Sequence, residues 1–327
     1  MYTTPHPDRP APCRPLHRQP PARRRPLGTE PAARGPTSAA RPGGDGPRAA
    51  TAPVGAGDVV ARRYLLREPI ATRRTAAVWL AHDCLLARPV VLKHVTAPAA
   101  GGVPAAVAEA RAAAAVGNRH VVTVHDVVAD PDGGAWIVME ALDGESLASS
   151  ISRTGGLRPA EVVSVAHALA SALAALHGAG VVHRDVKPGN VQLCPDGRVV
   201  LLDLGVAVGG DRDGTRGPQV VAGTIEYLAP EVVVSGRSSP GSDLYALGAT
   251  LFCAVEGVVP FRLTCVQDLV DHAADLPGPP PAARAGRLGP VLTGLLQPDP
   301  ARRWGVDEVR RYLARIDGSP AALAPVG

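Results

Sequence analysis

The sequence predicts an α+β protein in which a small β-rich lobe precedes a larger α-helical lobe. Three observations support this: 46% apolar residues, which is ample for a buried core, short strand-type runs up to residue 140, and helical periodicity from about Ser146. We find no run of 18 or more uncharged apolar residues, and Met1 opens no signal pattern. We therefore expect a soluble, cytoplasmic protein without a membrane span.

Residues 1–56 are expected to form a disordered basic tail. They are rich in Pro, Arg, Gly and Ala, so the burial of apolar surface cannot offset the entropy of ordering them. Nine Arg against Asp8, Glu30 and Asp45 give a balance of +6, leaving −2 for the remainder. An acidic partner or nucleic acid would suit this charge. Because no aromatic residues interleave with the arginines, a solvated extension or a misplaced start codon explains the tail better than nucleic-acid binding.

Strand-type runs dominate the region that follows the tail. They are rich in β-branched residues and bounded by turns, and one Ala-rich helical stretch over residues 105–116 interrupts them. The runs are Tyr64–Leu66, Ala77–Ala81, Val90–Val95, Val121–Val128 and Ala135–Glu140. A small sheet is therefore expected in the first lobe.

Helical periodicity marks the second lobe. Between Ala160 and His177 apolar residues recur every three or four positions, and Gly178 is expected to end this helix. A second apolar helix is expected over Leu244–Val255. The five cysteines lack Cys-x-x-Cys spacing, which disfavours a disulfide framework or a zinc site; they are Cys13, Cys84, Cys194, Cys253 and Cys265.

Two residue types are rare enough to be informative. The chain has 32 Arg but only two Lys, Lys93 and Lys187, and its only asparagines are Asn118 and Asn190. A chain that otherwise avoids these residues has kept them at very few positions. Since Lys supplies a compact point charge that Arg does not, these positions are candidates for a chemical requirement.

One stretch carries the most specific motif in the chain. Residues 183–190 read H-R-D-V-K-P-G-N, and Asp203-Leu204-Gly205 follow after a strand-like run. They resemble the catalytic loop and the metal-binding motif of protein kinases. Ala229-Pro230-Glu231 matches the motif that closes the activation segment, and Val90–Lys93 looks like the lysine-bearing strand motif. Several motifs in the family order make a chance match negligible.

The resemblance is to eukaryotic-like bacterial Ser/Thr kinases of the actinobacterial type. It runs from Tyr64 to about Ile316 and implies the two-lobed protein-kinase fold. The implied kinase domain spans residues 57–318, with the N-lobe at about 62–140, the C-lobe at about 143–316, and a C-terminal extension at 319–327. Protein Ser/Thr side chains are the implied substrates. The oligomeric state is not indicated.

The resemblance also assigns catalytic and metal-binding roles. Asp185 would take or orient the proton of the acceptor hydroxyl. Lys187 would contact the γ-phosphate of ATP, and Lys93 the α- and β-phosphates. Glu109, on the helix after the Lys93 strand, would hold Lys93. The oxygen ligands for Mg²⁺, or for Mn²⁺, would come from Asn190 and Asp203.

The nucleotide pocket departs from the family. Ala71, Arg73 and Ala76 occupy the three glycine positions of the phosphate loop, where a Cβ obstructs the approach of the backbone to phosphate. Val91 replaces a small Ala, and Gln192 stands where an apolar residue normally underlies the base. The residues expected to contact the nucleotide are Ile70, Ala71, Arg73, Ala76, Val78, Val91, Lys93, the gatekeeper Met139, the hinge residues Glu140 and Leu142, and Gln192.

Further roles follow from the resemblance. Thr215 is the expected autophosphorylation site, and Arg184 the residue that would pair with its phosphate. Thr224, with Gly223, is typical of Ser/Thr kinases. Structural roles are expected for three more residues: an ion pair between Glu231 and Arg303, and anchoring of the catalytic loop by Asp243.

Two alternatives stay open. A pseudokinase that acts as a scaffold or binding module would explain the phosphate loop without glycine. A pseudokinase would, however, be expected to lose at least one of Lys93, Asp185, Asn190 and Asp203, and all four are present. A small-molecule phosphotransferase of related fold is disfavoured by Ala229-Pro230-Glu231 and Arg303.

Overall fold

The computed structural model describes residues 54–73, 76–95, 107, 110–130, 134–203, 225–262, 268 and 278–316. At residues 72, 73 and 76 it describes the backbone alone. The predicted disordered tail over 1–56 lies almost entirely outside these residues. Of the predicted helix over 105–116, residues 107 and 110–114 are helical.

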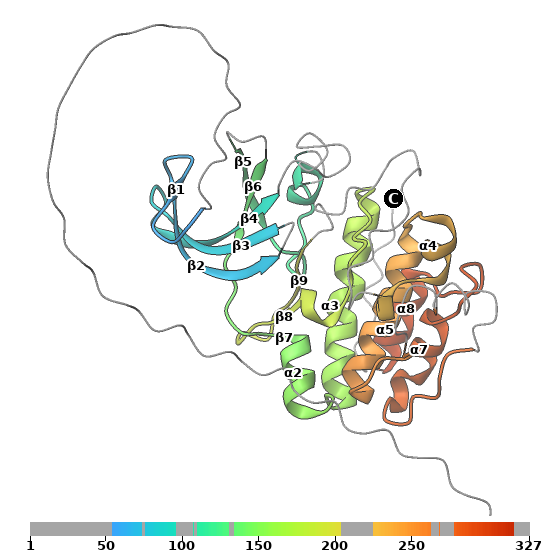
Figure 1. Cartoon of the computed structure of the whole chain (residues 1–327). Helices are drawn as coiled ribbons and strands as arrows, with labels where there is room; N and C mark the ends of the chain where they lie inside the picture. The colour runs from blue at the N-terminus through green and yellow to red at the C-terminus, as the bar shows by residue number, and fades with distance from the viewer. Residues whose placement is uncertain are drawn as a thin grey trace, which may run out of the picture. The chain divides into compact units, whose positions relative to one another are not determined.

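A six-stranded sheet forms the first lobe (Figure 1). Its strand order is β1-β2-β3-β4-β6-β5, and every pairing is antiparallel. The strands are β1 (Val59–Val60), β2 (Tyr64–Arg73), β3 (Ala76–Asp83), β4 (Arg88–Val95), β5 (Val124–Ala129) and β6 (Ala135–Glu140). The run predicted at Tyr64–Leu66 continues to Arg73. The run predicted from Val121 becomes a regular strand only at Val124, and Val121 forms an isolated bridge with Leu201.

Alternation along β4 divides the sheet into two faces. Val90 and Leu92 belong to a separate hydrophobic cluster within the first lobe. Val95 belongs to the main core, which also contains the large helices of the second lobe. Since successive strand residues point to opposite faces, Lys93 lies with Val95 on the face toward the second lobe. The sheet thus delivers this lysine to the boundary between the lobes.

Helices and a three-stranded sheet, β7-β8-β9, form the second lobe. Its elements are β7 (Glu145–Ser146), α2 (Leu147–Thr154), α3 (Pro159–Gly178), η1 (Pro188–Asn190), β8 (Val191–Leu193), β9 (Val199–Leu201), η2 (Ile225–Tyr227), α4 (Pro230–Ser235), α5 (Pro240–Glu256), η3 (Gly286–Leu288), α7 (Gly289–Leu295) and α8 (Val306–Ile316). Almost every residue from Ser242 to Val255 in α5 is buried. A helix that is apolar on all sides belongs in the centre of a core. Together, the two lobes give the two-lobed architecture predicted from the sequence.

Helix α3 ends at Gly178, as predicted, and Ala179 caps it. Within the described residues, α3 is the helix long and apolar enough to cross a membrane, and half of its apolar window is buried. The core helix of a soluble protein has the same length and composition. The helix is therefore weak support for a membrane span.

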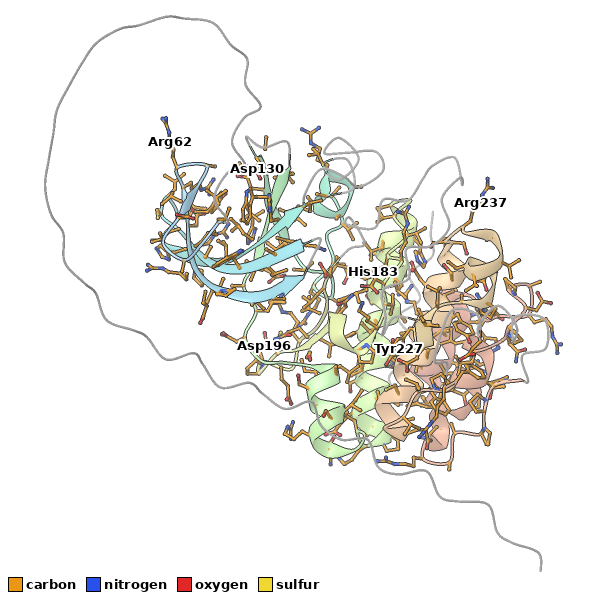
Figure 2. All side chains as sticks on the ribbon, viewed as in Figure 1. Arg62, Asp130, His183, Asp196, Tyr227 and Arg237 are labelled. Carbon is orange, nitrogen blue, oxygen red and sulfur yellow. The ribbon has the colours of Figure 1, made fainter. Side chains whose placement is uncertain are left out.

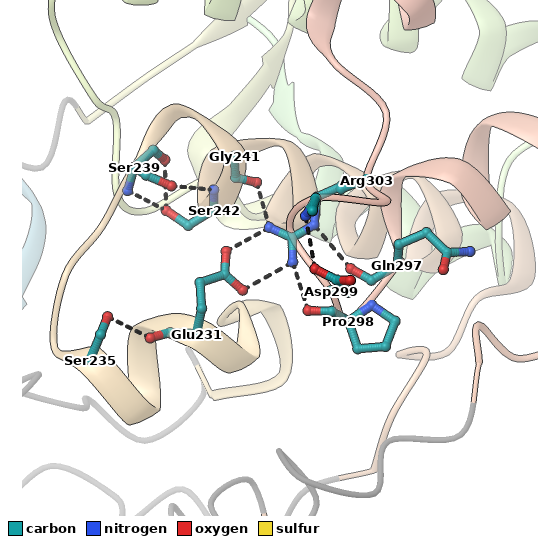
Figure 3. Close-up of polar contacts among 10 residues, drawn as sticks. Glu231, Ser235, Ser239, Gly241, Ser242, Gln297, Pro298, Asp299 and Arg303 are labelled. Atoms are coloured by element: carbon teal, nitrogen blue, oxygen red, sulfur yellow. Dashed lines mark hydrogen bonds and ion pairs between the residues drawn. The ribbon is translucent and has the colours of Figure 1, made fainter.

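The expected ion pair between Glu231 and Arg303 is present (Figure 3). Two Arg303 nitrogens contact the two Glu231 carboxylate oxygens at 2.6 and 3.0 Å. The same guanidinium donates to the carbonyls of Gly241, Gln297 and Pro298. Because the Arg303 side chain is 1% exposed, its charge is satisfied entirely within the protein. The pair joins α4 to the segment before α8.

Candidate active site

Residues 181–187 form a loop between α3 and η1, and α5 anchors this loop. Asp243, in the first turn of α5, accepts hydrogen bonds from the backbone amides of His183 and Arg184, both at 2.8 Å. Arg184 has φ of 70°, a left-handed conformation that is uncommon for a residue other than glycine. Its surroundings must hold it there, and the Asp243 carboxylate supplies one such restraint.

A further contact joins α3 to the same carboxylate. His177, in the last turn of α3, places Nε2 2.8 Å from Asp243 Oδ2. Both side chains are at most 10% exposed. A negative charge near the start of α5 is also favoured by the helix dipole. Asp243 thus links three segments of the second lobe.

His183 connects the loop to the end of β9 (Figure 2). Its Nε2 lies 2.8 Å from the Leu202 carbonyl oxygen, so Nε2 carries the proton and donates. Its Nδ1 accepts from the Asp185 amide at 3.3 Å. Complete burial lowers the pKa of His183 below its ordinary value. The neutral imidazole therefore matches both contacts, whereas a protonated ring would direct an N–H at the Asp185 N–H.

The Asp185 carboxylate lies at the centre of a polar cluster. Lys187 Nζ is 2.7 Å from both carboxylate oxygens. Asn190 Nδ2 donates to Asp185 Oδ2 and to the Asp185 carbonyl, each at 2.8 Å. One of the chain's two lysines and one of its two asparagines thus orient the carboxylate expected to act on the acceptor hydroxyl.

Lys93 and Asp203 form an ion pair between the lobes. The Lys93 side chain is 7% exposed and the Asp203 side chain 39%, so the carboxylate remains open to solvent. Asp203 has φ of 57°, a second left-handed residue in the site. The expected partner of Lys93, Glu109, lies outside the described residues.

The side chains near Asp185 suit a divalent cation. The Asn190 amide nitrogen is engaged with Asp185, which leaves its amide oxygen as the atom for a cation. The Asp203 carboxylate supplies a second hard oxygen. Within the described part of the chain no group of three or more His, Cys, Asp and Glu residues gathers to hold a metal. This donor set fits a cation held by one or two side chains together with phosphate oxygens.

The expected nucleotide residues lie on the strands around Lys93. Val78 pairs with Lys93, and Val91 pairs with Met139. Ile70 is 58% exposed. Gln192, in β8, is half-buried and donates to the Asp143 carbonyl at 3.4 Å. Val78, Val91 and Met139 thus lie on neighbouring strands of the first sheet, whereas Gln192 belongs to the three-stranded sheet; that they contact a nucleotide stays a prediction.

The phosphate loop is a tight hairpin. After a register shift between Pro69 and Ala71, the β2–β3 pairing resumes with Ala71 opposite Val78 and extends to Arg73 opposite Ala76. Only residues 74 and 75 lie between the paired ends, and they are outside the described residues. In this hairpin without glycine, the two strands stay regularly paired up to the residues that flank the tip.

The side chain of Glu140, at the expected hinge, is held by two groups of the protein. Its Oε1 accepts from the Thr123 amide at 2.9 Å, and its Oε2 pairs with Arg198 at 2.9 Å. Any contact with a nucleotide is left to the Glu140 backbone and to Leu142, which is half-buried. Arg198 was not predicted, because no motif marks it among 32 arginines.

Thr215 and Thr224 also lie outside the described residues. Arg184, the expected partner of a Thr215 phosphate, is exposed at the surface of the catalytic loop.

Comparison with known proteins identifies the family. Residues 74–312 match the protein kinase domain. The chain is 33% identical over 259 residues to Serine/threonine-protein kinase PknA of Mycobacterium tuberculosis, covering 76% of this chain and 59% of the relative. It is 37% identical over 202 residues to PknL of the same species, covering 61% and 50%. It is 31% identical over 255 residues to Serine/threonine-protein kinases drp72 of Corynebacterium efficiens, covering 76% and 49%.

The chain spans about half to three fifths of the length of these curated relatives. The family match covers most of the chain and includes both the sheet lobe and the helical lobe. This chain belongs to the protein kinase domain family.

Proposed function

We propose that this chain is a cytoplasmic Ser/Thr protein kinase that uses ATP with Mg²⁺ or Mn²⁺, and that residues 57–318 form its catalytic domain. The observation that carries the proposal is the cluster of Asp185, Lys187 and Asn190 beside the Lys93–Asp203 ion pair. The names of its relatives support protein Ser/Thr side chains as substrates. Autophosphorylation belongs to the same proposal.

The residues of the chain divide the work of phosphoryl transfer. Asp185 accepts the proton of the attacking hydroxyl, and Asn190 and Lys187 fix its orientation. Lys187 lies where it can also neutralise charge on the transferred phosphoryl group. When the nucleotide binds, Lys93 contacts its phosphates in place of Asp203. The Asp203 carboxylate is then available as a ligand for a cation. A divalent cation on Asp203 and Asn190 supplies further neutralisation of the phosphate oxygens.

A pseudokinase is the second candidate, because the phosphate loop has no glycine and Val91 narrows the adenine site. The intact cluster around Asp185 favours the enzyme: a scaffold would place no demand on the Lys187–Asp185 and Asn190–Asp185 contacts.

Incubation of purified protein with labelled ATP tests the proposal. We expect phosphate transfer to a protein substrate or to the chain itself with Mg²⁺ or Mn²⁺, and none from Asp203→Asn under the same conditions. Equal incorporation by the native protein and Asp203→Asn would point to a contaminating kinase. Absence of transfer with both cations and several protein substrates would favour the pseudokinase.

Regulation through the activation segment is a further part of the proposal. Thr215 is the only Ser or Thr between Leu204 and Thr224, and a phosphate there would find Arg184 on the catalytic loop. We expect Thr215→Ala to lower activity several-fold. Mass spectrometry of ATP-treated protein should find phosphate on Thr215; phosphate confined to residues 1–56 would contradict the assignment.

A further inference from the structure

Residues 141–144 connect β6 to β7 and so carry the chain from the sheet lobe to the helical lobe. An ion pair lies beside this connection. Glu140, the last residue of β6, contacts Arg198, which lies in the turn between β8 and β9 of the helical lobe. The Glu140 side chain is 16% exposed and the Arg198 side chain 23%. We call these two residues the hinge pair.

The Arg198 side of the hinge pair is fixed by its own turn. The Arg198 carbonyl accepts from the Cys194 amide at 2.8 Å, and the Arg198 amide donates to Asp196 Oδ1 at 2.9 Å (Asp196 is labelled in Figure 2). Gly197 has φ of 81°, which a residue with a Cβ adopts only with strain. Burial opposes the charge of Arg198, but the hydrogen bond and charge of Glu140 leave its pKa above the ordinary value. Arg198 is therefore an ordered, charged donor.

The Glu140 side is held by a segment that belongs with the helical lobe. Residues 118–123 follow the helical residues 110–114, and Asn118 donates to Ser171 of α3 at 3.1 Å. Two contacts join this segment to β9. His120 Nδ1 lies 2.8 Å from the Val199 carbonyl oxygen, and the Val122 amide donates to the Leu201 carbonyl at 3.0 Å. The same segment ends at Thr123, whose amide donates to the Glu140 carboxylate.

The backbone of Glu140 contacts this segment as well, since the Glu140 amide donates to the Thr123 carbonyl at 3.0 Å. Both the main chain and the carboxylate of this one residue are therefore held by groups attached to the helical lobe. Because Glu140 is the last residue of β6, these contacts fix the position of that end of the sheet lobe relative to α3 and β9.

We propose that Arg198 is a positioning residue for the nucleotide: through Glu140 it fixes the connection at 141–144 and the separation of Lys93 from Asp203. The inference rests on the proposed function, because it assumes that a nucleotide binds between the lobes. Among the residues that the structure describes, two ion pairs, Lys93–Asp203 and the hinge pair, join the lobes. Once phosphates draw Lys93 away from Asp203, the hinge pair still restrains the lobes.

A purely structural ion pair would behave differently. Most exposed pairs contribute little to stability, and their loss alters no ligand affinity. The hinge pair is mostly buried and shares its carboxylate with a backbone amide, so its loss would remove a restraint on the connection between the lobes. Coupling through such a connection typically changes affinity by a few-fold to tens-fold.

The chain offers a matched control. Arg153 pairs with Glu145, which joins α2 to β7 within the helical lobe, and both side chains are largely exposed. Arg153→Ala therefore removes an arginine from an ion pair without affecting a contact between the lobes. We expect it to leave nucleotide affinity unchanged.

The experiment compares Arg198→Ala, Arg198→Lys, Glu140→Gln and Arg153→Ala in the full chain. Calorimetric titration with ADP in the absence of metal measures affinity, and hydrogen exchange of the amides at residues 123 and 140–144 measures the hinge directly. We expect Arg198→Ala to weaken ADP binding about fivefold and to speed exchange, Arg198→Lys to recover part of both, and Arg153→Ala to change neither. In turnover assays KM for ATP should rise while kcat stays within about twofold.

The outcomes separate this inference from the proposed function. Unchanged ADP affinity and unchanged exchange in Arg198→Ala overturn the positioning role, whatever its thermal stability. Additive effects of Glu140→Gln and Arg198→Ala in the double variant also overturn it, because residues that act as a unit are not additive. If the native protein binds no ADP, the proposed function fails, and the exchange measurement alone then supports or overturns the restraint at the hinge.

Discussion

The catalytic loop and the phosphate-loop hairpin are built in opposite ways. The catalytic loop is bonded to the buried start of α5 through Asp243 and to the end of β9 through His183. The hairpin of β2 and β3 ends level with β4, since Ala76 pairs with Val95; it carries the exposed Ile70 and has irregular register before Ala71. The first region retains every expected residue, and the second has lost all three glycines. The expected catalytic residues are thus present in the loop that is bonded to the core, whereas the expected glycines are absent from the loop of the hairpin.

Replacing Asp185 by Asn tests the catalytic loop most severely. We expect phosphotransfer to fall about a hundredfold to ten-thousandfold, the range for losing a positioned base, with thermal unfolding nearly unchanged. The Asn side chain can keep one contact with Lys187 through its amide oxygen but cannot take the hydroxyl proton.

The control for this change is Asp307→Asn, an exposed carboxylate in the first turn of α8. It should retain turnover. Near-normal turnover in purified Asp185→Asn would show that the catalytic assignment is wrong.

Removing Arg303 tests how much the helical lobe depends on buried polar groups. Arg303→Met leaves the Glu231 carboxylate and three carbonyls without their donor. We expect a loss of about 3 kcal/mol in the free energy of unfolding, as for other buried pairs that lose one partner. Denaturant unfolding measures it.

The comparison variant is Arg310→Ala, whose pair with Asp307 on α8 is exposed. It should change stability by less than about 0.5 kcal/mol. If Arg303→Met unfolds at the same denaturant concentration as Arg310→Ala, the buried pair does not stabilise the lobe.

The sequence predicted most where a motif carries the chemistry. The motif groups Asp185, Lys187 and Asn190 because phosphoryl transfer requires those groups at those spacings, and their side chains are in contact. Their catalytic and metal-binding roles, with that of Asp203, stay predictions. The end of β2 was predicted too short, since polar residues and two register shifts, between Leu66 and Glu68 and between Pro69 and Ala71, interrupt the strand pattern. The side-chain partners of Glu140 could not be predicted, because Thr123 and Arg198 approach it only through the pairing of β6 and the β8–β9 turn. Long-range contacts of this kind leave no local pattern.

Restoring glycine to the hairpin tests the other region. We expect the triple variant Ala71→Gly, Arg73→Gly, Ala76→Gly to bind ATP with Mg²⁺ about tenfold more tightly. A backbone hydrogen bond to a charged group contributes roughly 1.5 to 3 kcal/mol, and removing Arg73 offsets part of that gain because its guanidinium can bind phosphate. Glycine in a strand also weakens it. Calorimetric titration of native and variant protein gives the comparison.

Two results would change this interpretation. Equal affinity would mean that Arg73 compensates fully for the missing glycines. No binding by either protein would place the fault at Val91 or Gln192 and would favour the pseudokinase.

Acidification should loosen the catalytic loop and leave the hairpin unaffected, and this is the smallest expected effect. Burial lowers the pKa of His183 from its ordinary value of 6.5, so the unfolded chain takes up a proton at a higher pH than the folded protein does. The stabilisation from neutral His183 is therefore complete above about pH 6.5 and is lost as the pH falls, by up to about 1.4 kcal/mol per pH unit.

His183→Gln keeps a donor for the Leu202 carbonyl but does not titrate. We expect it to be less stable than the native protein at pH 7.5 and the difference to shrink towards pH 5.5, in denaturant unfolding at fixed ionic strength. His125, whose pKa burial also lowers, is present in both proteins and cancels. A difference that stays constant from pH 7.5 to 5.5 would show that His183 does not hold the loop as a neutral imidazole.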